Sequence, residues 1–195
     1  MSNSLRVINR GLVRLGVPPL ASLSSADAQA IVAETLYEEV KRAALADFPW
    51  SFALRETDLP KLALPTSQEP RWEQREYTYQ LPNDVVRVFG LISGDNYRLT
   101  GDQLHTEDKE ARLVYVADVG EQHWPEFFQK AVAFEFASAA AISLTEDARR
   151  AELMYEEKRE ALRRARAIDS QQTPHTVISL MKVYQKRTFN PLQGA

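Results

Sequence analysis

The sequence predicts a mainly α protein: an antiparallel bundle of about four helices that carries a small antiparallel β module and ends in an extended C-terminal arm. Two observations lead to this fold class. Apolar residues recur at three- and four-residue steps in the first and the last thirds of the chain, as they do on one face of a helix. Between these stretches, proline and glycine are dense and long helices are disfavoured. We expect the bundle over residues 1–50 and 121–170, the β module over 51–120, and the arm over 171–195.

Bulk composition is that of an ordinary globular protein. Hydrophobic residues make up 44% and charged residues 26% of the 195 residues, which argues against wholesale disorder. The formal net charge of −3 provides no general attraction to nucleic acid or to an anionic membrane. The absence of cysteine excludes disulfides, a thiol nucleophile and a cysteine-ligated metal, and it fits assembly in a reducing cytoplasm.

No stretch of the sequence has the form of a membrane segment or a secretory signal. The first six residues lack a basic segment followed by an apolar run. The most apolar stretch, Ala131 to Leu144, is interrupted by Glu135 and is shorter than the roughly 20 residues that a spanning helix needs. We therefore expect a soluble protein with no membrane partner.

Two helices are predicted before the β module. The first covers residues 4–16, where Gly16 and the two prolines after it end the pattern. The second is expected to begin at Ser24, with Asp27 as a capping partner, and to run to about Asp47. The expected buried stripe of the second helix is Ala28, Ile31, Val32, Leu36, Val40 and Ala43 or Ala44.

Short strands are predicted over the middle of the chain. Apolar and polar residues alternate at 77–81 and at 112–116, and residues 85–92 form a β-branched and aromatic run suited to a covered strand. Turn-forming residues flank a further short strand at 97–99. The pattern indicates a small antiparallel sheet or barrel.

Two more helices are predicted after the β module. The third begins at Trp124-Pro125, with proline at a favoured first-turn position, and grades into an alanine-rich run. Thr145 is expected to cap the fourth helix, which reaches about Ile168 and has Glu146 and Asp147 in its first turn. The arginine-rich end of this helix is interleaved with acids, which indicates a solvated face rather than a nucleic-acid patch.

The C-terminal segment loses helical periodicity and is nonetheless apolar. Residues 171–174 are expected to form a linker. One interpretation is that the following segment folds back over the protein's own bundle, and the other is that it forms an arm that buries its side chains on another subunit. Composition does not choose between them. The apolar residues concerned are Val177, Ile178, Leu180, Met181, Val183, Tyr184, Phe189 and Leu192.

No catalytic, metal-binding or cofactor-binding motif is present. The three histidines, His105, His123 and His175, are far apart in the sequence and have no zinc-protease spacing. There is no nucleophile elbow, phosphate-binding glycine loop or dinucleotide fingerprint. We therefore expect neither enzymatic activity, nor a metal, nor a cofactor. Two alternatives stay open: an enzyme with an unrecognised hydrolytic site, and a helical regulatory module.

Four strings occur in the order found in one family. They are Asn9-Arg10-Gly11-Leu12-Val13-Arg14-Leu15-Gly16-Val17-Pro18-Pro19-Leu20, Phe48-Pro49-Trp50-Ser51-Phe52-Ala53, Tyr79-Gln80-Leu81-Pro82-Asn83-Asp84 and Trp124-Pro125-Glu126-Phe127-Phe128. Over about residues 5–168 the chain resembles the head-to-tail adaptors of short-tailed bacteriophages, the tail tubular protein A family. Each string is moderately specific, and their joint order is more so.

The resemblance implies a structural protein of the virion neck, assembled in the host cytoplasm. It implies a homo-oligomeric ring, a dodecamer, that joins the portal protein to a tail nozzle protein of the tail tubular protein B type. DNA would pass through the ring without specific binding. It also favours the arm that docks on the portal over the segment that folds back. No catalytic residue transfers with the resemblance.

Overall fold

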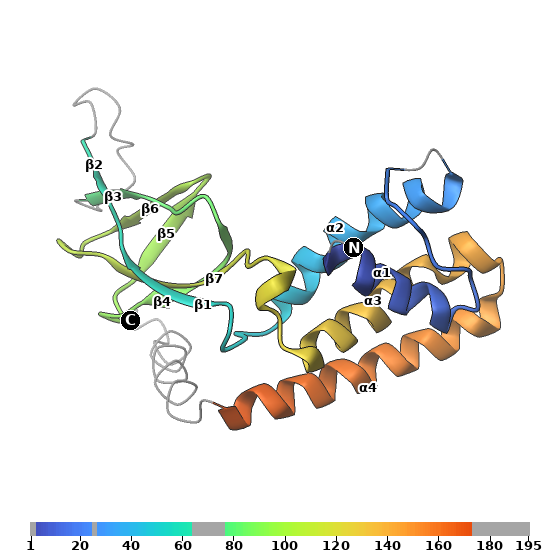
Figure 1. Cartoon of the computed structure of the whole chain (residues 1–195). Helices are drawn as coiled ribbons and strands as arrows, with labels where there is room; N and C mark the ends of the chain where they lie inside the picture. Colours follow the sequence, from blue (N-terminus) through green and yellow to red (C-terminus); the bar gives the residue numbers. More distant parts are fainter. Residues whose placement is uncertain (1–2, 25–26, 64–76, 173–195) are drawn as a thin grey trace, which may run out of the picture. The chain divides into compact units, whose positions relative to one another are not determined.

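The computed structural model describes residues 3–24, 27–63 and 77–172, and the chain divides into two compact units. The helical unit comprises Met1–Phe52 and Val119–Gln172. The described part of the second unit lies within Ala53–Asp118 and consists of strands (Figure 1).

The expected fold class is wrong. Helices account for 52% of the described residues and strands for 21%, and the strands form two antiparallel sheets, one of three and one of four strands. The protein is therefore a mixed α and β fold and not a helical bundle with a small β module. The strands were underestimated because several of them are short and polar, and their pairing joins residues that lie far apart in the sequence.

The helical unit contains α1 (Asn3–Arg14), α2 (Ala28–Asp47), α3 (Glu126–Thr145), α4 (Ala148–Gln172) and the short 3-10 helix η1 (Glu121–His123). α1, α2 and α4 each pack against α3, which is the central helix (Figure 1). Apolar residues lie on several sides of α3 because it has neighbours on several sides. Its buried residues are Phe128, Ala131, Val132, Ala133, Phe134, Phe136, Ala137, Ala140 and Ala141.

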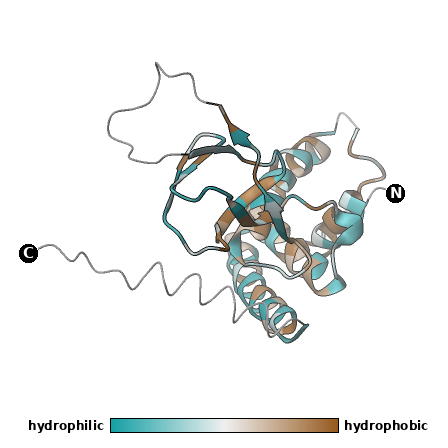
Figure 2. Ribbon diagram, turned by 90° about the vertical axis from the view of Figure 1, so that its left-hand side faces the viewer, coloured by the Kyte–Doolittle hydropathy of each residue, from teal (hydrophilic) through white to brown (hydrophobic). Residues whose placement is uncertain are grey.

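Among the described residues, α3 is also the one helix long and apolar enough to cross a membrane by length and composition alone. Half of its most apolar window is buried inside the structure. A packed central helix has the same composition. Figure 2 shows the helices of the unit with apolar and polar residues on different sides.

α1 approaches α3 closely at a glycine. A Cβ atom on Gly11 would lie 2.6 Å from Cδ1 of Phe136 and 2.9 Å from the carbonyl oxygen of Ala133. The segment after α1 is then held by Asn9, whose side chain donates to the Leu20 carbonyl at 2.9 Å and accepts from the Leu20 N–H at 2.8 Å. Asn9 thus satisfies both backbone groups of Leu20, which a loop would otherwise leave to water.

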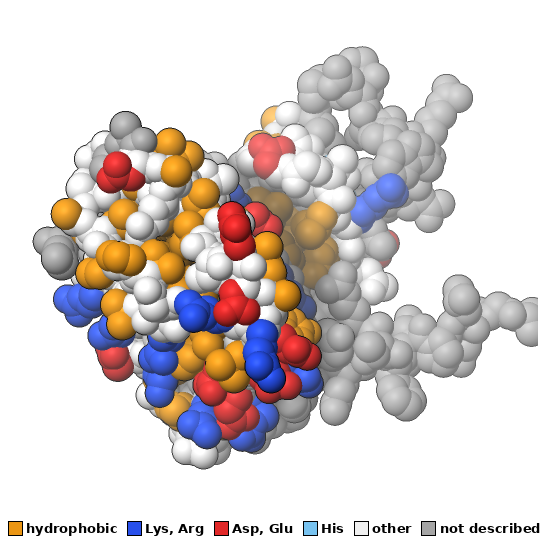
Figure 3. Space-filling view, turned by 90° about the vertical axis from the view of Figure 1, so that its right-hand side faces the viewer, with side chains coloured by type: hydrophobic (Ala, Val, Ile, Leu, Met, Phe, Trp, Pro, Cys, Tyr) orange, Lys and Arg blue, Asp and Glu red, His pale blue; other side chains and the backbone are white. Residues whose placement is uncertain are grey.

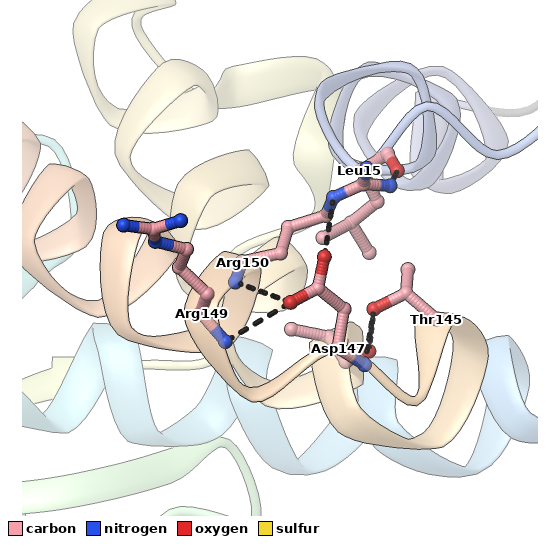
Figure 4. Close-up of polar contacts among 6 residues, drawn as sticks. Leu15, Thr145, Asp147, Arg149 and Arg150 are labelled. Atoms are coloured by element: carbon pink, nitrogen blue, oxygen red, sulfur yellow. Dashed lines mark hydrogen bonds and ion pairs between the residues drawn. The ribbon is translucent and has the colours of Figure 1, made fainter.

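The corner between α3 and α4 differs from the predicted one. Glu146 adopts a left-handed conformation, with φ of 52°, and ends α3. The carboxylate of Asp147 accepts hydrogen bonds from the N–H groups of Arg149 at 3.0 Å and Arg150 at 3.1 Å, so Asp147 caps α4 (Figure 4). Thr145 instead donates its hydroxyl to Ala141 within α3. The predicted cap at Thr145 is therefore wrong by two residues.

Two other helix predictions need correction. α2 begins at Ala28 rather than at Ser24, and its N-cap Asp27 makes no side-chain capping bond. Its buried residues are Ala30, Ala33, Tyr37, Val40, Ala44 and Leu45, so most of the expected stripe is wrong. α4 continues to Gln172, which places the first two residues of the expected linker, Gln171 and Gln172, in a helix.

The strand unit contains two antiparallel sheets. One has the order β1 (Leu54–Asp58), β7 (Arg112–Ala117), β4 (Val85–Leu91). The other has the order β2 (Lys61–Leu62), β3 (Tyr77–Gln80), β6 (Gln103–Thr106), β5 (Tyr97–Thr100). Both sheets contribute to one hydrophobic core, which consists of Leu59, Tyr79, Leu91, Leu104, Ala111, Leu113, Tyr115 and Ala117.

The two ends of the strand unit are neighbours. β1, the first strand, pairs with β7, the last strand, in the register Leu54 opposite Val116. The Ala117 N–H also donates to the Ala53 carbonyl at 2.9 Å. The chain therefore enters and leaves this unit through one pair of strands.

Candidate functional site

The predicted portal-binding residues lie outside the described part of the chain. These are Val177, Ile178, Leu180, Met181, Val183, Tyr184, Phe189 and Leu192, and His175 lies outside it as well. The arm therefore stays a prediction. The helix that precedes it, α4, is described to its end at Gln172.

The two described histidines lie in different units. His105 on β6 is buried, and its Nδ1 lies 3.0 Å from the hydroxyl of Thr78 on the neighbouring strand β3. His123 is the exposed last residue of η1. Within residues 3–24, 27–63 and 77–172, no group of three or more His, Asp or Glu side chains is placed to hold a metal ion.

A basic groove lies on the helical unit between α1 and α3. It is an open groove with a volume of about 640 Å³, and it is lined by Arg6, Asn9, Arg10, Val13, Arg14, Glu126, Lys130 and Ala133. We call it the α1–α3 groove. Four of these side chains are cationic and one is anionic, so the groove carries a local excess of positive charge in a chain whose net charge is −3.

Two of the groove's arginines have specific partners. Arg10 forms an ion pair with Glu126, with 2.8 Å between Nη1 and Oε1. The guanidinium of Arg14 lies over the ring of Phe134, 3.8 Å from the ring centre, which is a cation–π contact. These contacts hold the arginine stems along α3. Val13 lies between the charged side chains and is 62% exposed, so the groove combines positive charge with apolar surface.

The exposed face of α2 has the opposite character. It carries Glu34, Glu38 and Glu39, with Arg42 as its one basic member, and Ile31, which is 56% exposed. Lys41 is only 12% exposed and lies 3.9 Å from Glu121 and 4.0 Å from Glu38. We call this surface, from Ile31 to Arg42, the acidic α2 face.

The inner side of α2 is fixed against the core. The Tyr37 hydroxyl donates to Glu121 at 3.3 Å, and the Tyr37 ring packs edge-on against Phe136 with 6.4 Å between ring centres. Burial, together with the nearby Glu121 carboxylate, raises the pKa of Tyr37 far above its usual value. The tyrosine therefore stays a neutral donor, and the orientation of α2 is set from the inside.

An aromatic cluster anchors the ends of the helical segments. Trp50 and Trp124 each pack on Phe128, with 4.8 Å between ring centres, and Phe52 packs on it at 4.9 Å. The Trp50 indole donates to the Ala44 carbonyl and the Trp124 indole donates to the Val119 carbonyl, each at 2.8 Å. Trp50 and Phe52, which are close in the sequence, therefore pack in this cluster with Phe128 of α3.

Several charged residues of α4 pair with opposite charges on α4 itself or on neighbouring helices. Lys158 lies 3.0 Å from Glu135 of α3, and Arg166 pairs with Asp47 of α2. Glu160 accepts hydrogen bonds from Arg163 and Arg164, which lower the pKa of Glu160 to about 2. This agrees with the interpretation of the arginine-rich end as a solvated face.

Sequence reasoning missed the α1–α3 groove. One signal was present, because Arg6, Arg10 and Arg14 follow one another at four-residue steps on a single helix face. The contribution of α3 was not visible in the sequence, since Lys130 and Glu126 are more than 100 residues away and join the groove only through packing.

Comparison with known proteins adds no relative: no protein-family model and no curated protein sequence matches the chain.

Proposed function

We propose that this protein is a head-to-tail connector of a short-tailed phage, a homo-oligomeric ring between the portal and the tail nozzle with DNA passing through it. The observation that carries the proposal is the order of the four strings that begin at Asn9, Phe48, Tyr79 and Trp124. Their resemblance to the adaptor family covers most of the described chain.

The structure gives each string a definite physical role, and this supports treating them as more than chance matches. In the first string, Asn9 holds Leu20 and Gly11 permits the close contact with α3. The second and fourth strings supply Trp50 and Trp124, which pack on Phe128. In the third, Tyr79 is buried in the core of the strand unit and its hydroxyl donates to the Asp108 carbonyl at 2.8 Å.

A structural role also fits the charge of the chain. A DNA conduit works best if it retains few phosphates, because each retained phosphate adds salt-dependent affinity. A chain with net charge −3 has no overall attraction to DNA. Four of the six arginines of α4 are engaged with carboxylates: Arg163 and Arg164 with Glu160, Arg150 with Asp147, and Arg166 with Asp47.

The direct test is the mass of the assembly. The full chain is mixed with the portal protein encoded in the same genome and examined by multi-angle light scattering and native mass spectrometry. We expect a closed complex that contains about twelve copies of this chain per portal ring. A chain that stays monomeric at high concentration, with and without portal, would overturn the proposal. A discrete small oligomer with hydrolytic activity would favour the enzyme alternative.

The arm is tested by a chain that ends at Thr173. This truncation removes no described helix, because α4 ends at Gln172. Ordering a free arm costs about 1–2 kcal/mol per residue of backbone entropy, so a portal surface that covers its apolar side chains is needed to order it. We expect full helicity by circular dichroism and loss of portal binding. The matched control is the full chain with Tyr184→Ala and Phe189→Ala, which should bind more weakly while keeping its length.

A further inference from the structure

We infer that the α1–α3 groove of one copy receives the acidic α2 face of the next copy, so that these two surfaces form the interface between subunits. The inference rests on the proposed function, because it names the contact that would close the proposed ring. It goes beyond that function, because nothing in the resemblance to the adaptor family identifies the interface.

The two surfaces complement each other in charge. The groove presents Arg6, Arg10, Arg14 and Lys130 against the single carboxylate of Glu126. The acidic α2 face presents Glu34, Glu38 and Glu39 against the single guanidinium of Arg42. Complementary potentials of this kind steer association and fix register. Figure 3 shows basic, acidic and exposed apolar side chains side by side on one face of the helical unit.

The two surfaces also complement each other in apolar contact. Val13 and Ala133 line the groove between the basic side chains, and Val13 is 62% exposed. Ile31 projects from α2 at 56% exposure, one helical turn from Glu34. In the proposed interface, Ile31, which has acidic residues beside it, contacts Val13 and Ala133, which have basic residues beside them. This is the arrangement of an amphipathic helix in a groove.

The surfaces point in different directions on the helical unit, so one copy cannot satisfy both within itself. Lys130 lines the α1–α3 groove and also a hollow between α3 and α4. α2 packs on another side of α3, through Tyr37 against Phe136. At about 100° per residue, Ile31 lies about 120° from Tyr37 around the α2 axis, so the acidic α2 face is turned away from α3, which lines the groove. A contact between two different patches is heterologous, and repeated heterologous contacts form a ring when the rotation between copies closes and an open filament when it does not.

A second copy fits the groove better than nucleic acid does. Phosphate recognition calls for a polar surface with free donors, whereas Arg10 pairs with Glu126, Arg14 lies over the ring of Phe134, and exposed Val13 lies among them. Covering the groove with a neighbouring subunit would also hide its arginines from DNA in transit, where retained phosphates would add affinity.

The test is a pair of charge reversals in the full chain. Arg6→Glu with Arg10→Glu makes the groove acidic, and Glu34→Lys with Glu38→Lys makes the α2 face basic. Each variant alone should lose the ring, measured by light scattering with portal present and folding checked by circular dichroism. An equimolar mixture should recover it, since each altered surface then meets its opposite in alternating copies. Glu152→Lys with Glu156→Lys on α4 is the matched control and should assemble as the unaltered chain does.

A crosslink locates the contact directly, because the chain has no cysteine of its own. With Val13→Cys and Ile31→Cys in one chain, a short bis-maleimide should give a ladder of covalent dimers, trimers and higher species. Either cysteine alone should give dimers at most. Leu153→Cys paired with Ile31→Cys serves as the control and should give no ladder.

The outcomes separate the two proposals. If the unaltered chain forms rings and the charge reversals leave them intact, or if the mixture fails to recover rings from folded variants, the interface is wrong and the connector stands. If the groove variant assembles normally but loses affinity for duplex DNA, the groove binds phosphates and the inference is overturned. If the unaltered chain forms no ring with portal, the connector proposal fails and the interface fails with it.

Discussion

Asp169, in the last turn of α4, accepts two hydrogen bonds from Ser51: one from its N–H at 2.9 Å and one from its hydroxyl at 2.8 Å. The carboxylate is 1% exposed, and the two residues are separated by 118 positions in the sequence. Asp169 therefore fastens the end of α4 to the segment that follows α2, beside Trp50.

Because of this contact, we expect Asp169→Ala to destabilise the protein more than Ser51→Ala does. Asp169→Ala leaves a partly buried N–H and a hydroxyl of Ser51 without their acceptor, and we expect it to lower the free energy of unfolding by about 1–3 kcal/mol. Ser51→Ala removes only the hydroxyl bond, and we expect about 1 kcal/mol. Urea denaturation followed by circular dichroism measures both. Equal stability of all three proteins would contradict the prediction.

Gly11→Ala tests the close contact between α1 and α3. Alanine normally stabilises a helix interior by up to about 1 kcal/mol relative to glycine. Here the new Cβ would meet Phe136 at 2.6 Å and a backbone oxygen at 2.9 Å, and overpacking of this kind costs about 1–3 kcal/mol. We therefore expect a lower melting temperature. A higher one would show that the contact relaxes without cost.

We expect His105→Ala and His123→Ala to lower stability by unequal amounts and to reveal no catalytic role. His105→Ala removes a buried ring and the partner of the Thr78 hydroxyl, and we expect a loss of about 1–3 kcal/mol. His123→Ala alters an exposed residue and should change stability by less than about 0.5 kcal/mol. Assays for peptidoglycan, peptide and ester hydrolysis should be negative for the unaltered chain. Activity abolished by either substitution would refute this.

The lowered pKa of Glu160 predicts that its contribution to folding stability decreases at low pH. Its pKa is about 2 in the folded protein, below the ordinary 4.5, because Arg163 and Arg164 donate to the carboxylate. Its stabilising contribution is therefore present above pH 4.5 and is lost as the pH falls towards 2. Because the group is exposed, salt should weaken the effect. An NMR titration of the carboxyl carbon should give a midpoint near 2 that rises in Arg163→Gln. A midpoint unaffected by that substitution would contradict the assignment.

The buried face of a helix was predictable from the sequence where large apolar residues lie on that face. α1 and α4 each bury one stripe of residues, because each packs on α3 from one side, although Val13 on α1 and Leu153 on α4 are exposed. α2 misled the prediction because its buried side is built largely from Ala30, Ala33 and Ala44, and alanines also occur elsewhere on the helix. Larger residues such as Ile31 then seemed to define the stripe, although Ile31 is 56% exposed.

Strands were predictable where burial imposed alternation and not where backbone pairing alone defines them. Residues 77–80 and 112–117 have core-facing side chains and were found. β1 is mostly polar, Leu54 to Asp58, and exists because its backbone pairs with β7 about 60 residues later. A pairing at that separation leaves no local signal, which is why the sequence predicts a small β module and not two sheets. The α1–α3 groove was missed for the same reason.

Because its first and last strands are paired, the strand unit has the form of an inserted module that can be cut out as one piece. Because Ala53 and Ala117 are joined by a hydrogen bond, a short synthetic loop can bridge the cut on either side. Genetic excision of residues 53–118 would leave two helical segments to be reconnected, and the excised piece would keep its first and last strands together. Domain insertion is tolerated best at exposed sites and where the two ends of the inserted piece lie close together. We therefore expect that the strand unit can be exchanged as one piece without changing the sequence of the helices.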